Sequence, residues 1–155
     1  MNKEAKSLGA TESNFVNPHG LYNDNHYTTV YDLYLIFNEA IKYSKFVDTL
    51  SCMKYTGSFT RKTAYGDYSI GCSYTNSNGF LTGSYATPDG IKVYGGKAGY
   101  TEVARRSYVM LAESNNGHKY IIITMRAESN SLMYKDLSAL LNKIPVDKKS
   151  YAGNE

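Results

Sequence analysis

The sequence predicts an α+β fold in which an antiparallel sheet lies between helices on both of its faces. Two stretches, SYVMLA (107–112) and KYIIITM (119–125), are apolar at consecutive positions instead of alternating ones. Strands of this kind are buried on both faces, so a sheet built from them needs helices on each side. Asn116-Gly117, between the two stretches, is typical of a tight hairpin turn and predicts antiparallel pairing.

The clearest helical pattern follows a polar loop in the first part of the chain. Apolar residues recur at helical spacing over about 29–43, and Thr29 with Asp32 forms a capping-box pattern at the start. A short turn of helix is expected immediately afterwards, over 44–50. This region therefore supplies one of the helical layers.

Two further helices are predicted at the ends of the sequence. The pattern over 1–8 stops at Gly9 and begins without a capping residue, so it resembles the second half of a helix. A last helix begins at a cap on Asn130 or Ser131 and stops at Pro145. Its apolar stripe is made of Met133, Leu137, Leu140, Leu141 and Ile144.

The strands are distinct in the second half of the chain and weak before it. Residues 52–87 are rich in Tyr, Thr, Ser and Gly, and predict one or two short strands with a long loop. Three clearer strands are predicted near 90–97, 107–113 and 119–126.

Composition excludes several classes of protein. A chain of 155 residues fits one domain, and 42% hydrophobic with 20% charged residues is ordinary for a soluble protein. The net charge is only +3 and the Lys and Arg residues are scattered, so no nucleic-acid partner is expected. The three histidines are dispersed and Cys52 and Cys72 lack metal-ligand spacing, so neither a metal nor a cofactor is predicted. The sequence does not decide whether the two cysteines form a disulfide.

Sixteen tyrosines and no tryptophan are the unusual part of the composition. Tyrosine suits β-strands and surfaces that are half apolar, so half-buried rings in a strand-rich fold are the expected explanation. A surface that stacks on carbohydrate rings is the alternative. No apolar run approaches the roughly 18 residues that span a membrane, and MNKEAKSLG at the start lacks the apolar region of a signal peptide.

The stretch GGKAGYT (95–101) carries the candidate chemistry. An ammonium such as that of Lys97, placed on a strand edge, attracts a substrate carboxylate and biases nearby proton transfers. Gly99 allows a peptide to approach the strand backbone closely. Taken alone, the stretch is more typical of a glycine-rich turn with a solvated lysine. Its flanking segments reverse that interpretation.

The order of the segments resembles the serine-type D-alanyl-D-alanine carboxypeptidases of peptidase family S11, which are low-molecular-weight penicillin-binding proteins. The resemblance is carried by MNKEAKSLGATESNFVNPHGL (1–21), HYTTVYDLYLIFNEAI (26–41), TNSNGFL (75–81), PDGIKVYGGKAGYT (88–101) and IIITMRAES (121–129). It implies a β-lactamase/transpeptidase-like fold that is incomplete here, without its N-terminal strands and its nucleophile helix. The resemblance implies that residues 1–145 form the C-terminal portion of that catalytic domain, and 146–155 are expected to be a frayed tail.

The resemblance also implies an activity and a set of site residues. Such enzymes hydrolyse the D-Ala-D-Ala bond of peptidoglycan stem peptides through a serine acyl-enzyme, are acylated by β-lactams, and work outside the cytoplasm at the cell wall or membrane. Their motifs are S-x-x-K, S-x-N and K-T-G. Only the third is present, as Lys97-Ala98-Gly99, with Tyr100 offering a backbone N–H to an oxyanion hole and Thr101 beside the substrate. Ala98 replaces the usual threonine, whose hydrogen bond to the substrate carboxylate is worth about 1–3 kcal/mol.

Because the first two motifs are absent, the chain by itself is expected to be inactive. Its implied partner is the missing N-terminal segment of the same domain, and the strand at 119–126 is expected to expose an apolar edge where that segment belongs. Two other functions stay open. One is a non-catalytic module that binds cell wall or a protein partner, and the other is the complementing half of a split enzyme.

A catalytic set within the chain is the remaining alternative. Ser51 and Lys54 spell S-x-x-K, and Tyr74 with Asn76 spells a variant of the second motif. The serine and lysine must share one turn at the start of a buried helix, whereas Ser51 follows a helix in the predicted structure. The match is therefore interpreted as a coincidence, and His19 in NPHGL as part of a structural loop.

Overall fold

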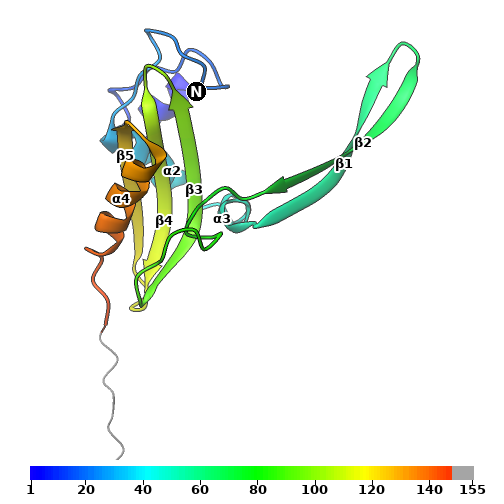
Figure 1. Cartoon of the computed structure of the whole chain (residues 1–155). Helices are drawn as coiled ribbons and strands as arrows, with labels where there is room; N and C mark the ends of the chain where they lie inside the picture. Colours follow the sequence, from blue (N-terminus) through cyan, green and yellow to red (C-terminus); the bar gives the residue numbers. More distant parts are fainter. Residues whose placement is uncertain (148–155) are drawn as a thin grey trace, which may run out of the picture.

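The structure is a computed structural model that describes residues 1–147. Its elements in chain order are α1 (Asn2–Ser7), α2 (Val30–Ala40), α3 (Ser44–Ser51), β1 (Lys54–Thr63), β2 (Gly66–Thr75), β3 (Ile91–Thr101), β4 (Arg105–Ser114), β5 (Lys119–Ala127) and α4 (Asn130–Leu141). Strands β3, β4 and β5 form one antiparallel sheet, and β1 with β2 forms a separate hairpin that projects from the body like an arm (Figure 1). The predicted tail falls largely on 148–155, which lie outside the described residues.

Helices cover both faces of the three-stranded sheet, as the sequence predicts. On one face, residues of β4 such as Met110 pack in a cluster with Leu137 and Leu141 of α4. On the other face, Leu111 packs with Phe37 of α2 and Leu50 of α3. The alternation along β4 thus sends neighbouring residues into two different cores, which explains why this strand is apolar throughout. None of the helices within residues 1–147 is long and apolar enough to cross a membrane.

The helix ends follow the predicted caps only in part. The Thr29 hydroxyl accepts a hydrogen bond from the Asp32 N–H at 3.0 Å, as in a capping box. The Asp32 carboxylate instead accepts a 2.6 Å hydrogen bond from the buried Ser13 hydroxyl. The cap predicted at Asn130 or Ser131 is wrong by one residue or two: Ser129 is extended, and its hydroxyl accepts from the N–H of Leu132 at 3.1 Å.

Residues 54–75 form a long hairpin, so the predicted strands are present but longer than expected, and the predicted loop is the segment 76–90 that follows them. Ten residues of β1 pair with ten of β2, from Lys54↔Thr75 to Thr63↔Gly66. Residues directly opposite each other share a face, so one face carries Tyr55 with Tyr74, Phe59 with Ile70, and Arg61 with Tyr68. The opposite face is polar, with Ser, Thr, Lys and Asp side chains.

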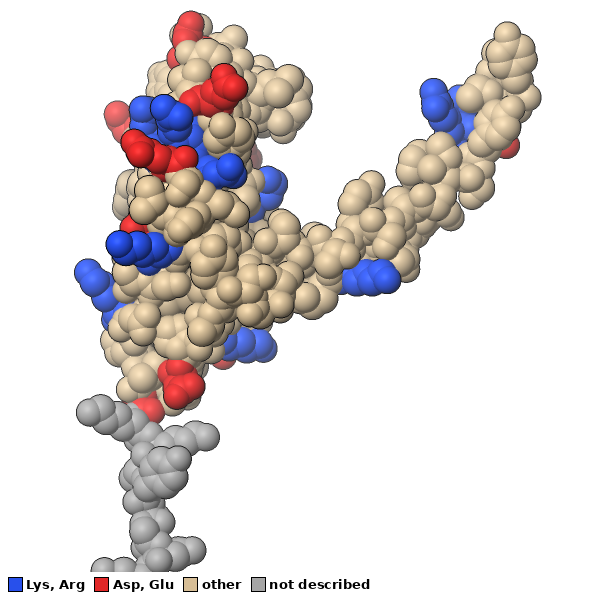
Figure 2. All heavy atoms as spheres, in the orientation of Figure 1, with Lys and Arg blue, Asp and Glu red and all other residues tan. Residues whose placement is uncertain are grey.

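The tyrosines of this arm are more exposed than the sequence analysis expects. Tyr55, Tyr68 and Tyr74 are 58%, 54% and 64% exposed, whereas Tyr108 and Tyr134 are buried in the body. Figure 2 shows that few charged side chains interrupt the surface of the arm. The two cysteines, Cys52 and Cys72, are free thiols, so no disulfide ties the arm to the body.

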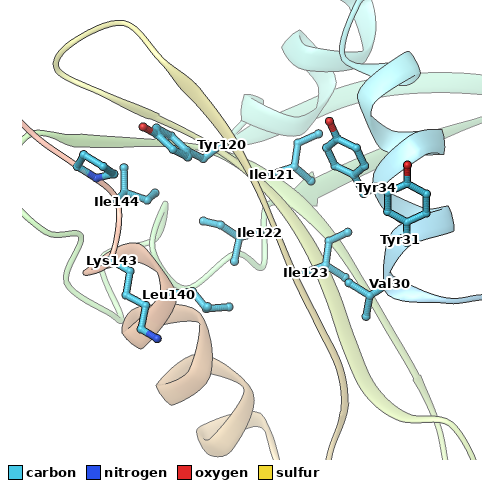
Figure 3. Close-up of a pocket in the computed structure, with 11 residues that line it drawn as sticks. Val30, Tyr31, Tyr34, Tyr120, Ile121, Ile122, Ile123, Leu140, Lys143 and Ile144 are labelled. Atoms are coloured by element: carbon cyan, nitrogen blue, oxygen red, sulfur yellow. The ribbon is translucent and has the colours of Figure 1, made fainter.

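The sheet has two different edges, β3 on one side and β5 on the other. Beside β5 runs a groove of about 610 Å³. Figure 3 shows side chains of β5 on its floor, with residues of α2 on one side and of α4 and the following turn on the other. Its lining is almost entirely apolar: Val30, Tyr31, Tyr34, Tyr120, Ile121, Ile122, Ile123, Leu140, Lys143, Ile144 and Pro145. Within residues 1–147, β4 is the only strand that pairs with β5, so the expected apolar edge is present.

Candidate functional site

The stretch singled out by the sequence lies on the exposed edge strand β3, near its C-terminal end. Lys97, Ala98, Gly99 and Tyr100 are all exposed. Lys97 and Gly99 stand opposite Val109 and Ser107 of β4, on the face that α2 and α3 cover. Because side chains alternate along a strand, Ala98 and Tyr100 point to the α4 face. The motif therefore presents a cation on one face of the edge and a small residue with an aromatic ring on the other.

Two glycines before Lys97 are required by packing. Gly95 has φ +129°, at a register shift in the pairing of β3 with β4, and a Cβ there would lie 2.2 Å from the Leu50 carbonyl oxygen. A Cβ on Gly96 would lie 2.1 Å from the Val109 carbonyl oxygen. Gly95 thus lets the end of α3 dock on β3, and Gly96 lets β4 lie close to it, so both fix the strand from which Lys97 projects.

Gly99 is glycine for a different reason. A Cβ built there meets nothing within 4 Å, and its φ is not in the left-handed region. Neither packing nor backbone conformation among residues 1–147 demands a glycine. What its hydrogen side chain does provide is an unobstructed approach to the strand backbone. This is the property expected where an extended peptide lies against an edge strand.

The loop behind the motif is held by two asparagines. The Asn76 amide donates to the carbonyl oxygens of Leu50 and Cys52, each at 3.1 Å, and ties the base of the arm to α3. The buried Asn78 amide donates to the Tyr108 hydroxyl at 2.8 Å, beneath Ala98. Both asparagines thus have structural roles.

The buried hydroxyl of Tyr108 is a supporting group that no sequence motif marks. Burial and the neighbouring Tyr134 raise the pKa of Tyr108 to about 12, although the hydrogen bond from Asn78 lowers it. The ring packs against Tyr134 and remains neutral at physiological pH. Its partner Tyr134 in turn accepts a hydrogen bond from the N–H of Gly79 at 2.8 Å. The sequence shows that tyrosines are frequent, but it shows neither which of them are buried nor what they contact.

The other candidates occupy positions that limit their chemistry. Thr101 closes the β3–β4 turn, and its hydroxyl accepts from the Ala104 N–H at 3.0 Å. Ser51 ends α3 and donates to the Val47 carbonyl at 3.0 Å, whereas Lys54 begins β1, so the two do not share a helical turn. This placement favours the interpretation of this S-x-x-K as a coincidence, which stays a prediction. His19 lies in a loop, where its Nδ1 accepts from the Leu21 N–H at 3.2 Å.

A small pocket lies on the α4 side of the motif. It measures about 120 Å³ and is lined by Ala98, Gly99, Tyr100, Arg106, Asn130 and Met133. The Arg106 guanidinium lies over the Tyr100 ring, 4.5 Å from its centroid. No motif in the sequence singles out Arg106. Its side chain is brought to the motif because β4 places it directly opposite Tyr100.

Comparison with known proteins decides the family. A sequence model described as D-alanyl-D-alanine carboxypeptidase matches residues 1–129. The chain belongs to the S11 D-alanyl-D-alanine carboxypeptidase family. D-alanyl-D-alanine carboxypeptidase DacF of Bacillus subtilis is 33% identical over 121 residues, which make up 76% of this chain and 26% of DacF. The resemblance stated from the sequence is thereby confirmed.

Solved carboxypeptidase-family structures share the fold. A mutant of the Streptomyces K15 DD-transpeptidase has a TM-score of 0.75 at 26% identity, over 91% of this chain and 51% of that one. The D-alanyl-D-alanine carboxypeptidase of Mycobacterium tuberculosis has a TM-score of 0.66 at 25% identity, over 91% and 50%. The predicted transpeptidase-like fold is therefore present as a partial fold. The chain spans about half the length of these solved relatives, and about a quarter of DacF.

Proposed function

We propose that this chain forms one wall of a D-alanyl-D-alanine carboxypeptidase site and binds peptides that end in a free carboxylate. The observation that carries the proposal is the open backbone edge of β3 at Gly99, next to Lys97, in a member of this family. A peptide in the extended conformation adds to such an edge as a further strand. The site lies outside the cytoplasm, where the peptidoglycan stem peptides of the cell wall are found.

In this proposal each motif residue has one role. The Lys97 ammonium attracts negative charge and biases proton transfer at the reacting carbonyl. The Tyr100 N–H stabilises the oxyanion that develops when a serine attacks the penultimate D-Ala carbonyl. That attack forms an acyl-enzyme and releases the terminal D-Ala, and water then hydrolyses the ester. A β-lactam follows the first step through opening of its ring.

The serine comes from outside this chain. The S-x-x-K and S-x-N motifs belong to the partner segment that completes the domain, and the groove beside β5 is where that segment docks. Three observations support this assignment: the single pairing of β5 within residues 1–147, the apolar lining of the groove, and the greater length of the relatives. The chain alone is accordingly inactive, and its contribution is to bind and orient the peptide.

A pair of glycine variants tests peptide binding on β3. N-acetyl-D-alanyl-D-alanine is titrated into the ¹⁵N-labelled chain, and the amide shifts of residues 97–101 are followed. Gly99→Ala places a methyl group on the open edge. It is expected to weaken peptide binding about tenfold, because the methyl group blocks a backbone hydrogen bond between the peptide and β3. The matched control is Gly71→Ala on β2, another strand glycine with nothing within 4 Å, which is expected to bind like the unmodified chain.

Either of two results would contradict the proposal. The first is equal binding by the two variants. The second is a set of shifts that bypasses β3 altogether. Both variants are expected to melt at the temperature of the unmodified chain, because neither methyl group meets a neighbour. A loss of binding is therefore not attributable to unfolding.

The exposed arm favours one second candidate, a non-catalytic module that binds cell-wall glycan. Tyr55, Phe59 and Tyr74 form an apolar face on which sugar rings can stack, and more than half of each side chain is exposed. An NMR titration with a disaccharide–peptide fragment of cell wall discriminates between the two functions. Shifts of amide signals in β1 and β2, without shifts in β3, would support the glycan-binding module.

A further inference from the structure

A cavity of about 600 Å³ lies where the arm joins the body, and we call it the arm-base pocket. One wall is the last turn of α3, with Asp48 and Thr49, and the other is the base of the arm, with Tyr55 and Tyr74. Its volume falls within the range of about 300–1,000 Å³ that is typical of small-ligand sites. It shares no lining residue with the pocket beside Ala98, so the two cavities are separate.

One aromatic ring of the arm-base pocket is supported from below by its own strand. A Cβ on Gly57 would lie 2.7 Å from the Tyr55 hydroxyl oxygen and 3.0 Å from the ring carbon that bears it. The φ of Gly57 is not positive, so the Tyr55 ring, and not the backbone conformation, requires a glycine there. Although its phenol end rests over Gly57, more than half of the Tyr55 side chain is exposed. Tyr74 stands directly opposite on the same face and is also exposed, so the two rings form an aromatic wall.

The opposite wall offers hydrogen-bond acceptors. The Asp48 side chain is exposed and takes part in no ion pair within residues 1–147. The Thr49 hydroxyl donates its proton to the Lys45 carbonyl at 2.7 Å, so its oxygen is left to accept a hydrogen bond. Asn76 also lines the pocket, but its amide donates twice to the backbone and its side-chain oxygen accepts from the Asn78 N–H, so it holds the loop in place. A ligand that fits this pocket therefore donates hydrogen bonds on one side and presents apolar surface on the other.

The charges around the arm-base pocket favour a neutral ligand. Lys45 lies one turn before Asp48 on α3, and Lys54 precedes Tyr55 on β1, and both lysines are exposed. These two cations outweigh the single carboxylate, so the pocket does not concentrate ammonium ions. The carboxylate in the lining in turn repels an anion. A sugar ring satisfies both walls without charge, because it has hydroxyl donors around its rim and an apolar face of C–H groups that packs on an aromatic ring.

We propose that the arm-base pocket is a saccharide-binding subsite, in which Tyr55 and Tyr74 stack on a neutral sugar ring and Asp48 accepts hydrogen bonds from its hydroxyl groups. The inference goes beyond peptide binding on β3 and does not depend on it, because the pocket contains no residue of that strand. It also narrows the glycan-binding candidate from the whole aromatic face of the arm to its base, where α3 supplies the polar half of the site.

The test titrates a neutral disaccharide, N,N′-diacetylchitobiose, into the ¹⁵N-labelled full chain. Amide shifts are expected at 48–55 and 74–76, and not at 97–101. Tyr55→Ala removes the supported ring and Asp48→Ala removes the acceptor, and each is expected to weaken disaccharide binding about tenfold. Tyr55→Phe keeps the ring and is expected to bind nearly as well as the unmodified chain.

Matched variants separate the pocket from the rest of the arm. Phe59→Ala removes a ring from the same face of β1 but outside the pocket, and is expected to leave the affinity unchanged. A loss of affinity as large as that of Tyr55→Ala would overturn the inference, because the sugar would then lie along the whole face. Asp48 is on α3, so Asp48→Ala tests the pocket independently of any change that Tyr55→Ala causes in the folding of the arm.

Two further ligands test the chemistry of the pocket. Sorbitol has hydroxyl groups but no ring, and butylammonium has a charge but no hydroxyl group. Neither is expected to shift the pocket amides at the concentration at which the disaccharide does, and equal shifts by either one would overturn the inference. Disaccharide binding that neither Tyr55→Ala nor Asp48→Ala weakens would overturn it as well.

The outcomes also distinguish this inference from the proposed function. If the disaccharide does not bind, the saccharide subsite is wrong and the peptide site on β3 stands. If N-acetyl-D-alanyl-D-alanine does not bind, the peptide site is wrong and the saccharide subsite stands.

Discussion

Gly95, Gly96 and Gly99 occupy one strand for different physical reasons. The first two admit a neighbouring carbonyl to within a distance that a Cβ would forbid, so the fold requires them. Gly99 has open space around it, so the fold does not. The distinction matters because glycines next to each other in a motif are easily given a single role. Here the pair positions the strand, and the third leaves it accessible.

The Tyr108 hydroxyl leads to a prediction about alkaline pH. Its pKa rises from 10.0 in the unfolded chain to about 12 in the fold, first because of burial. A raised pKa means that the folded state holds its proton more tightly, so stability is full below pH 10 and declines as pH rises from 10 to 12. Urea unfolding between pH 9 and 12 is expected to show this decline in the unmodified chain and a smaller one in Tyr108→Phe.

The control for that measurement is an exposed tyrosine. Tyr65 at the tip of the arm is 92% exposed, so Tyr65→Phe is expected to leave the alkaline decline unchanged. An identical decline in Tyr108→Phe and the unmodified chain would show that other groups cause it.

At the scale of elements, the sequence was informative wherever burial dictates the pattern. β4 and β5 are readable because both of their faces are buried, and α2 because its apolar stripe packs on β5. The length of the arm is not predicted because its ten-residue strands lie outside both cores, and the short alternation along them is interrupted by Gly57, Arg61 and Gly71. The cap of α4 was misplaced because Ser129, Asn130 and Ser131 are all good capping residues, and only the backbone conformation selects one.

For the site, the sequence located the motif but not its surroundings. Lys97 to Tyr100 could be named from their order and from the flanking segments. The pocket on the α4 side could not, because it depends on the pairing of Tyr100 with Arg106 across two strands. Its other wall comes from α4, which starts some thirty residues after the motif. Spacing along a chain contains no signal for such a contact.

The arm is expected to be the least stable element of the chain. A two-stranded hairpin in water is at best marginally stable, because it has no third strand or helix to cover its apolar face. Amide hydrogen exchange is therefore expected to be fast over β1 and β2 and slow over β4, whose residues Met110, Leu111 and Ala112 are fully buried. Protection of the arm equal to that of β4 would show that something covers it, and self-association would then be the first explanation to examine.

At the scale of the whole molecule, the two edges of the sheet have separate uses. β3 is proposed to bind peptide and β5 to bind the rest of the domain. Mixing this chain with the part of DacF that its match leaves uncovered is expected to give a complex on size exclusion. The DacF segment in that complex is expected to react with a fluorescent penicillin, whereas this chain alone forms no adduct.

The groove supplies the control for this mixing experiment. Val30→Asp places a carboxylate on its apolar lining and is expected to prevent the complex, because a charge buried without a partner is costly. Tyr65→Asp adds the same charge at the tip of the arm and is expected to leave the complex intact. A stoichiometric penicillin adduct on Ser51 of this chain alone would contradict the whole scheme and make the chain self-sufficient.

The strand order of the sheet has a consequence for how the chain folds. β3, β4 and β5 are neighbours both in sequence and in space, joined by two short turns, so most of their contacts are local. Local contacts close quickly because little chain entropy is lost before they form. The edge that carries the peptide motif is therefore expected to be built early, and the docking of a second segment on β5 to be a later, concentration-dependent step.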